Sequence, residues 1–156
     1  DYAAFRAGLR AVTQMLARAI AKDGEGATKL IVSKVVGAKD KQTARTVAKS
    51  VICSNLFKAA MFGADANWGR VLCAIGYSGA DVDVNKIDVS FSSEAGSVAV
   101  CSNGAGIPFS EEMASKVLAP NEIRVLIDLC DGEEEATAWG CDLTYDYVKI
   151  NGDYRT

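Results

Sequence analysis

Five cysteines and no histidine limit the chemistry that this chain could do by itself. The cysteines, at positions 53, 73, 101, 130 and 141, include no CxxC pair and fit neither a disulfide framework nor a structural zinc site. Without histidine, neither a Ser-His-Asp nor a Cys-His nucleophile system is possible within the chain. We therefore expect no metal site, and we expect cysteines that serve as small apolar residues in a reducing cytoplasm or mitochondrial matrix.

A polar cluster of Asp65, Asn67 and Arg70 surrounds a predicted helix start. Asp and Asn can cap the helix, and Arg70 can pair back with Asp65. The sequence leaves two interpretations open: these residues only cap and pack, or they support the residues of a nearby site. The segment 102–106, Ser-Asn-Gly-Ala-Gly, could form an anion-binding nest, but a plain loop is the simpler interpretation because no Lys-Ser/Thr follows it.

Apolar periodicity and capping residues predict the helices that must position these groups. Residues 3–22 form an amphipathic helix with a solvated basic ridge on its other face, and the segment Asp23-Gly24-Glu25-Gly26 ends it. Further helical segments are predicted at 40–62, from the N-cap Asn67 to about Tyr77, from Ser110 to near Pro120, and for one or two turns within 144–151.

Alternation of apolar and polar residues predicts the strands. These are 29–36, ended by Gly37; 87–91 and 98–100, which form a hairpin; 123–129; and a partner strand at 137–141 that follows the turn at Asp131-Gly132. The fold class is therefore α/β, with helices packed on a mixed, largely antiparallel sheet in one domain, residues 1–156, without an internal linker.

Charge and hydropathy exclude several partner classes. The net charge of -3 comes from 17 basic and 20 acidic residues mixed along the chain, so no basic patch for nucleic acid or an anionic membrane is expected. The longest apolar runs, such as 30–32, are far shorter than the roughly 20 residues of a membrane-spanning helix. We expect a soluble chain and a small, charged metabolite as ligand. The start at Asp1, without an initiator Met, suggests a fragment of a longer precursor.

Three segments resemble the ornithine acetyltransferases of arginine biosynthesis, which are bifunctional glutamate N-acetyltransferases. They are the segment 23–27 (DGEGA), the segment 65–70 (DANWGR) with 75–79 (IGYSG), and the ending 145–156 (YDYVKINGDYRT). Their order, their spacing and the terminal placement fit the C-terminal part of the β chain in that family. The similarity extends over nearly the whole chain.

The resemblance implies an enzyme that moves acetyl from N-acetylornithine to glutamate, and in some members from acetyl-CoA to glutamate. No cofactor is implied, and acetyl-CoA would be a substrate. The precursor cleaves itself before a threonine, which becomes the β-chain N-terminus and attacks the acetyl group with its own α-amine as base. An α chain would supply the oxyanion hole, and αβ units would assemble into larger oligomers.

Three residues match the substrate-binding set of that family: Glu25, Asn151 and Thr156. The resemblance implies that Glu25 holds the cationic amine of ornithine, while the Asn151 amide and the Thr156 hydroxyl and terminal carboxylate bind an amino-acid ligand. From residue chemistry alone, Glu25 would be a solvated turn residue and Thr156 part of a frayed end.

The family's nucleophile is missing, because the chain begins with Asp1 and not with a threonine. Thr13 and Thr28 cannot replace it, since neither has a free α-amine or a neighbouring histidine. We expect the nucleophile upstream, in the rest of the β chain. Two alternatives stay open: an autoprocessed amidohydrolase or aminopeptidase, in which water replaces glutamate, and a non-catalytic ligand-binding or assembly domain.

Overall fold

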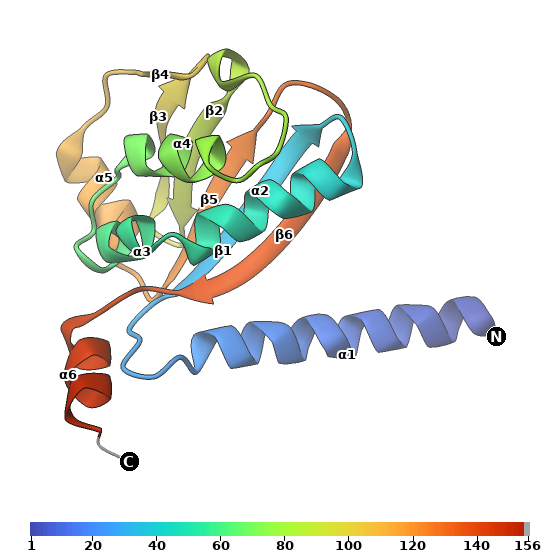
Figure 1. Ribbon diagram of the computed structural model, residues 1–156, viewed down its shortest axis with the longest axis horizontal. Coiled ribbons are helices and arrows are strands. Elements are labelled where there is room, and N and C mark those ends of the chain that lie inside the picture. The colour runs from blue at the N-terminus through green and yellow to red at the C-terminus, as the bar shows by residue number, and fades with distance from the viewer. Residues whose placement is uncertain (155–156) are drawn as a thin grey trace.

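A six-stranded mixed sheet forms the centre of the fold, and the computed structural model of the protein describes residues 1–154 (Figure 1). The sheet order is β4-β3-β2-β5-β1-β6. The strands are β1 (Leu30–Ala38), β2 (Asp88–Ser93), β3 (Gly96–Ser102), β4 (Ala105–Gly106), β5 (Glu122–Asp128) and β6 (Glu134–Cys141). Only the β1–β5 pair is parallel within the described residues, so the predicted fold class is confirmed.

The helices are divided between the two sides and one end of the sheet (Figure 1). They are α1 (Tyr2–Lys22), α2 (Lys41–Cys53), α3 (Asn55–Phe62), α4 (Trp68–Gly76), α5 (Glu111–Leu118) and α6 (Tyr145–Asp153), with a 3₁₀ turn at Val84–Lys86. The helices α2 to α5 cover one face, α1 runs beside β1 and β6, and α6 lies at the end where α1 leads into β1. No helix in residues 1–154 is both long and apolar enough to span a bilayer.

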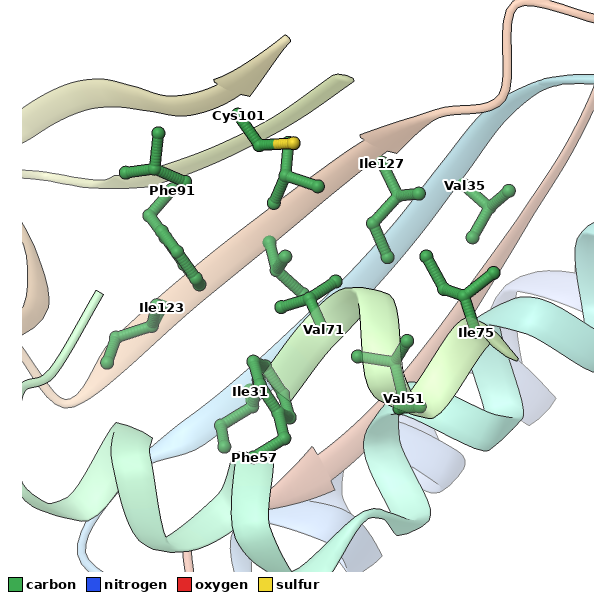
Figure 2. Close-up of a cluster of buried hydrophobic side chains, with 14 of the residues drawn as sticks. Ile31, Val35, Val51, Phe57, Val71, Ile75, Phe91, Cys101, Ile123 and Ile127 are labelled. Atoms are coloured by element: carbon green, nitrogen blue, oxygen red, sulfur yellow. The ribbon is translucent and has the colours of Figure 1, made fainter. Parts of the chain in front are cut away.

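The hydrophobic core lies between the sheet and the helices α2 to α5 (Figure 2). Ile31 and Val35 of β1 and Ile127 of β5 are fully buried and face Val51 of α2 and Ile75 of α4. On β5 the alternate residues Glu122, Arg124 and Leu126 are exposed on the opposite face. The sheet is therefore covered by helices on one face and largely open on the other.

The capping residues mark the helix starts that the sequence predicts. The Asn67 side chain accepts from Arg70 N, Ser110 accepts from Met113 N, and Thr144 accepts from Tyr147 N. Each oxygen therefore satisfies a backbone N–H that has no partner within its own helix.

Two of the sequence predictions about elements are wrong. The segment 40–62 contains two helices, because Ser54 leaves helical geometry with ψ of 113° and caps α3 instead. The strand at 134–141 follows β5 along the chain but pairs with β1, which lies between the two. The run Leu30-Ile31-Val32 is buried on both faces, and a strand of this kind belongs in the middle of a sheet. In addition, β1 continues through Gly37, whose φ of +66° bends the strand before Ala38.

Lys29 connects the start of β1 to the ends of two helices. Its Nζ donates to the Met61 carbonyl of α3 at 2.7 Å and to the Leu118 carbonyl of α5 at 2.9 Å. Burial lowers the pKa of Lys29 from its usual value, and the nearby Asp142 carboxylate partly opposes this shift. An ammonium group at helix C-termini also meets the negative ends of the helix dipoles.

We expect the substitution Lys29→Met to lower the free energy of unfolding by about 1 to 3 kcal/mol, because both carbonyls lose their donor while the aliphatic stem is kept. Denaturant unfolding of the full-length protein measures this effect. The matched control is Lys49→Met on the exposed surface of α2, which should change stability by less than about 0.5 kcal/mol. Equal stability of the two variants would show that Lys29 does not stabilise these helix ends.

Candidate functional site

The loop between α1 and β1 meets α6 at one end of the sheet, and this contact brings Glu25 and Asn151 together (Figure 1). The Asn151 Nδ2 group donates to Glu25 Oε2 at 2.8 Å, although the two residues are 126 positions apart in the chain. Both side chains are exposed. Two of the three residues expected in the substrate-binding set are therefore direct neighbours, while Thr156 lies outside the described residues.

The orientation of the Asn151 amide follows from its two partners. Nδ2 also donates to the Tyr147 carbonyl at 2.8 Å, one helical turn earlier in α6. Both partners are pure acceptors, so the amide nitrogen must face them. The amide oxygen then points elsewhere, and no group within residues 1–154 donates to it. The Glu25 carboxylate, oriented by a neutral amide, is an acceptor that suits a cationic amine.

The two glycines around Glu25 allow the loop to approach the rest of the chain very closely. A Cβ at Gly24 would lie 2.5 Å from the Cys141 Sγ, and a Cβ at Gly26 would lie 2.7 Å from the backbone nitrogen of Tyr147. Gly26 also has φ of +66°, a conformation that strongly favours glycine. The absence of a side chain at Gly24 and Gly26 thus lets the loop pack directly against β6 and α6.

Two buried side chains near this contact were not identified as site residues from the sequence. Asp142, at 3% exposure, accepts hydrogen bonds from the loop residues Thr28 and Lys29. Thr144, at 4% exposure, donates to the Gly26 carbonyl at 2.6 Å. Thr144 directly precedes the predicted helical turns, and threonine is a common helix cap, so its capping role could have been recognised from the sequence. Nothing in the local sequence links Asp142 or Thr144 to a loop more than one hundred positions away.

The polar cluster at Asp65, Asn67 and Arg70 forms a second, separate network. The Asn67 Nδ2 donates to Asp65 Oδ2 at 3.0 Å, and the Arg70 guanidinium donates to the Leu56 carbonyl at 2.8 Å. Arg70 makes no ion pair with Asp65 among the described residues. The cluster therefore caps α4 and ties it to α3, and within residues 1–154 no hydrogen bond joins it to Glu25.

The chemistry of the remaining reactive groups is limited. All five cysteines are unpaired. Burial and the neighbouring Asp88 raise the pKa of Cys101, and burial and Asp128 raise the pKa of Cys130, so these thiols are poor nucleophiles. Residues 1–154 contain no group of three or more His, Cys, Asp or Glu side chains that could hold a metal ion. The described residues thus offer groups that can bind a ligand, and neither Cys101 nor Cys130 is activated as a nucleophile.

Proteins of known sequence that resemble this chain are biosynthetic enzymes by name. The arginine biosynthesis bifunctional protein ArgJ 1 of Clostridium acetobutylicum is 54% identical over 156 residues, which are 100% of this chain and 38% of that protein. The glutamate N-acetyltransferase of Methanosarcina mazei is 50% identical over 153 residues, 97% of this chain and 39% of that protein. The chain thus spans less than half the length of these curated relatives.

A solved structure shares the fold. The crystal structure of the arginine biosynthesis bifunctional protein argJ from Bacillus halodurans superposes with a TM-score of 0.91 at 44% sequence identity, covering 99% of this chain and 71% of that one. The profile of the ArgJ family matches residues 1–156. With a match over this whole length, the chain belongs to the ArgJ family.

Proposed function

We propose that this chain is the substrate-binding part of an enzyme that transfers acetyl from N-acetylornithine to glutamate. The observation that carries the proposal is the hydrogen bond between Glu25 and Asn151, which joins two of the residues implied by the resemblance to ornithine acetyltransferases. The relatives named ArgJ and glutamate N-acetyltransferase support the same reaction class.

The proposed role of Glu25 is to bind the cationic amine of the ornithine moiety. Asn151 holds one carboxylate oxygen with a neutral amide, so the negative charge of Glu25 is kept for the ligand. The amide oxygen of Asn151, which accepts no hydrogen bond within residues 1–154, is a further acceptor on the side of the amide that faces away from Glu25. Thr156, with its hydroxyl and terminal carboxylate, is proposed to complete the amino-acid site. Asp65, Asn67 and Arg70 remain candidates for a supporting role near the site.

The proposed nucleophile is a threonine in the remainder of the longer protein, freed at a new N-terminus when the precursor cleaves itself. The free α-amine of this threonine would act as the base that deprotonates its hydroxyl. The hydroxyl would attack the acetyl carbonyl, which forms an acetyl-threonine enzyme and releases ornithine. Glutamate would then take the acetyl group. Backbone donors of the α chain would stabilise the tetrahedral intermediates. The reaction needs no cofactor, and acetyl-CoA would enter only as an alternative acetyl donor. A cytoplasmic or mitochondrial location is consistent with five unpaired cysteines.

Incubation of the intact, processed protein with N-acetylornithine, with and without glutamate, tests the proposed reaction. We expect ornithine to be released continuously only when glutamate is present, together with equal amounts of N-acetylglutamate. Sustained release without glutamate would make water the acceptor and the enzyme an amidohydrolase. Absence of release in both conditions would leave the chain with a binding or assembly role.

We expect Glu25→Gln to raise the KM for N-acetylornithine by about 10-fold or more, because a charge-assisted hydrogen bond contributes about 1.5 to 3 kcal/mol. Steady-state kinetics of the processed enzyme measure the change. Glu133→Gln, an exposed carboxylate in the loop between β5 and β6, is the matched control and should behave as the wild type. Unchanged kinetics of the Glu25 variant would remove this residue from the site.

An exposed apolar stripe on α1 supports a larger assembly. Its members, spaced by three or four positions, are each at least 49% exposed: Tyr2, Phe5, Leu9, Val12, Leu16 and Ile20. Arg18 is paired with Glu122 of the sheet. Arg18 follows Leu16 by two positions, which is a rotation of roughly 200° about the helix axis. Because Arg18 points toward the sheet, the stripe faces away from it. A helix of this kind needs a partner to bury its apolar face.

We propose that the occupant of the α1 stripe is an amphipathic segment in the remainder of the longer protein, with carboxylates beside its apolar side chains. The curated relatives are more than twice as long as this chain, so such a segment has ample sequence to come from. The charged residues within α1 are Arg6, Arg10, Arg18 and Lys22, without an acidic residue. A second copy of α1 in contact with the first would therefore bring like charges together.

We expect Leu9→Glu in the full-length protein to weaken the association of this region with the rest of the protein, because a charge replaces an apolar contact. Copurification of the cleaved chains and size-exclusion chromatography measure the effect. Ala7→Glu introduces the same charge on roughly the opposite side of α1 and should have little effect. Normal assembly of the Leu9 variant would contradict the proposal. If the cleaved chains still copurify and only the number of αβ units in the oligomer falls, the stripe contacts a second copy of the protein instead.

A further inference from the structure

Asp142 and Thr144 lie between the loop that carries Glu25 and the helix that carries Asn151, and neither contacts Glu25 directly. We propose that these two residues are positioning residues, which set the distance and orientation between Glu25 and Asn151. The inference rests on the proposed function, because it concerns the same amine-binding pair. It goes beyond that function by assigning the geometry of the pair to two buried side chains in the link between β6 and α6.

Asp142 fixes the end of the loop. Its Oδ1 accepts from the backbone nitrogens of Thr28 at 2.8 Å and Lys29 at 3.0 Å, and its Oδ2 accepts from the Thr28 hydroxyl at 2.5 Å. The backbone nitrogen of Asp142 in turn donates to the Lys29 carbonyl at 3.2 Å. A carboxylate that accepts three hydrogen bonds while 3% exposed has little freedom to move. The loop therefore enters β1 at a fixed place relative to the end of β6.

Thr144 connects the middle of the loop to the first turn of α6. Its hydroxyl donates to the Gly26 carbonyl at 2.6 Å and accepts from the backbone nitrogen of Tyr147 at 3.2 Å. A hydroxyl can donate one hydrogen bond and can also accept. The Thr144 hydroxyl does both, since it donates to Gly26 and accepts from Tyr147. The residue next to Glu25 is thereby fixed to the helix that carries Asn151.

The backbone around this bridge leaves no room for a side chain at position 26. A Cβ at Gly26 would lie 2.7 Å from the Tyr147 nitrogen, so the loop and the helix are in close contact at this point. From Tyr147 the connection continues through its carbonyl, which accepts from Asn151 at 2.8 Å. Asn151 then reaches back to Glu25. A closed ring of contacts therefore runs from Glu25 through Gly26, Thr144 and Tyr147 to Asn151.

Exposure explains why the pair needs this support. Glu25 and Asn151 are both exposed, so side-chain packing does not hold them. Their hydrogen bond competes with water, and the net stabilisation of such a bond is small. A backbone that is set in advance reduces the entropy lost when the pair closes on a ligand. A bound amine would then meet the Glu25 carboxylate without rearrangement of the loop.

The experiment compares threonine variants of the full-length, processed enzyme in the acetyl-transfer assay. We expect Thr144→Val, which keeps the shape and removes the hydroxyl, to raise the KM for N-acetylornithine by about three- to tenfold with a smaller change in kcat. Thr144→Ser keeps the hydroxyl and should restore most of the loss. The matched control is Thr43→Val, because Thr43 is also buried and donates to Asp40 at the start of α2, at the other end of the sheet (Figure 1).

The double variant Glu25→Gln/Thr144→Val separates positioning from stability. If Thr144 acts through Glu25, the double variant should have a KM close to that of Glu25→Gln alone, because the contact that Thr144 positions is already lost. A structural role alone would lower the unfolding midpoint and leave the KM of the folded enzyme unchanged. Should Thr144→Val fail to fold, Asp142→Asn gives a second test, since the amide keeps the shape and loses one acceptor.

Each outcome supports or overturns a specific claim. A raised KM for Thr144→Val that is not additive with Glu25→Gln supports the positioning role. Wild-type KM for Thr144→Val, or for Asp142→Asn, together with a raised KM for Glu25→Gln, overturns the positioning role and leaves the proposed function standing. Wild-type KM for Glu25→Gln itself overturns the proposed function of the pair, and the positioning role with it.

Discussion

The interior position of β1, between β5 and β6, is the constraint on which the rest of the structure depends. The start of β1 is buried on both faces of the sheet, at Leu30, Ile31 and Val32. The strand pairs with β5 on one side and with β6 on the other. Such a strand cannot shift its register without exposing apolar side chains and breaking two ladders. Asp142 and the Met61 carbonyl hold Lys29, the residue just before the strand. The loop that precedes β1, and Glu25 within it, therefore has a fixed starting point.

Much of the fold could be predicted from local signals in the sequence. The caps Asn67, Ser110 and Thr144 mark real helix starts, because capping is an interaction within three residues. The hairpin of β2 and β3 is equally local. The pairing of β6 with β1 could not be found in this way, since its partners are about one hundred residues apart and the local turn at 131–132 favours the wrong neighbour. Its cause is the two-sided burial of β1.

The candidate site was less predictable than the fold. Residue chemistry alone leaves Glu25 as a solvated turn carboxylate, and only the resemblance to a family selects it together with Asn151. The structure adds the contact between them and the buried residues Asp142 and Thr144 behind it. These contacts depend on how the segment before β1 meets the segment after β6, and the two are more than one hundred residues apart in the chain. The α1 helix shows the same limit, because its periodicity predicts an apolar face but not that this face is exposed.

The use of an amide opposite Glu25 has a consequence for ligand binding. An arginine or lysine at position 151 would also hold the carboxylate, but it would neutralise it and compete with a cationic amine. Asn151 orients the carboxylate without adding charge, and its own amide is oriented by the Tyr147 carbonyl. In the proposed site, the positive charge of the ligand would pair with the negative charge of Glu25, which has no cationic partner among the described residues. If Glu25 binds the ligand as proposed, selectivity for an amine would follow from this arrangement, since a neutral or anionic group would leave the carboxylate without a counter-charge.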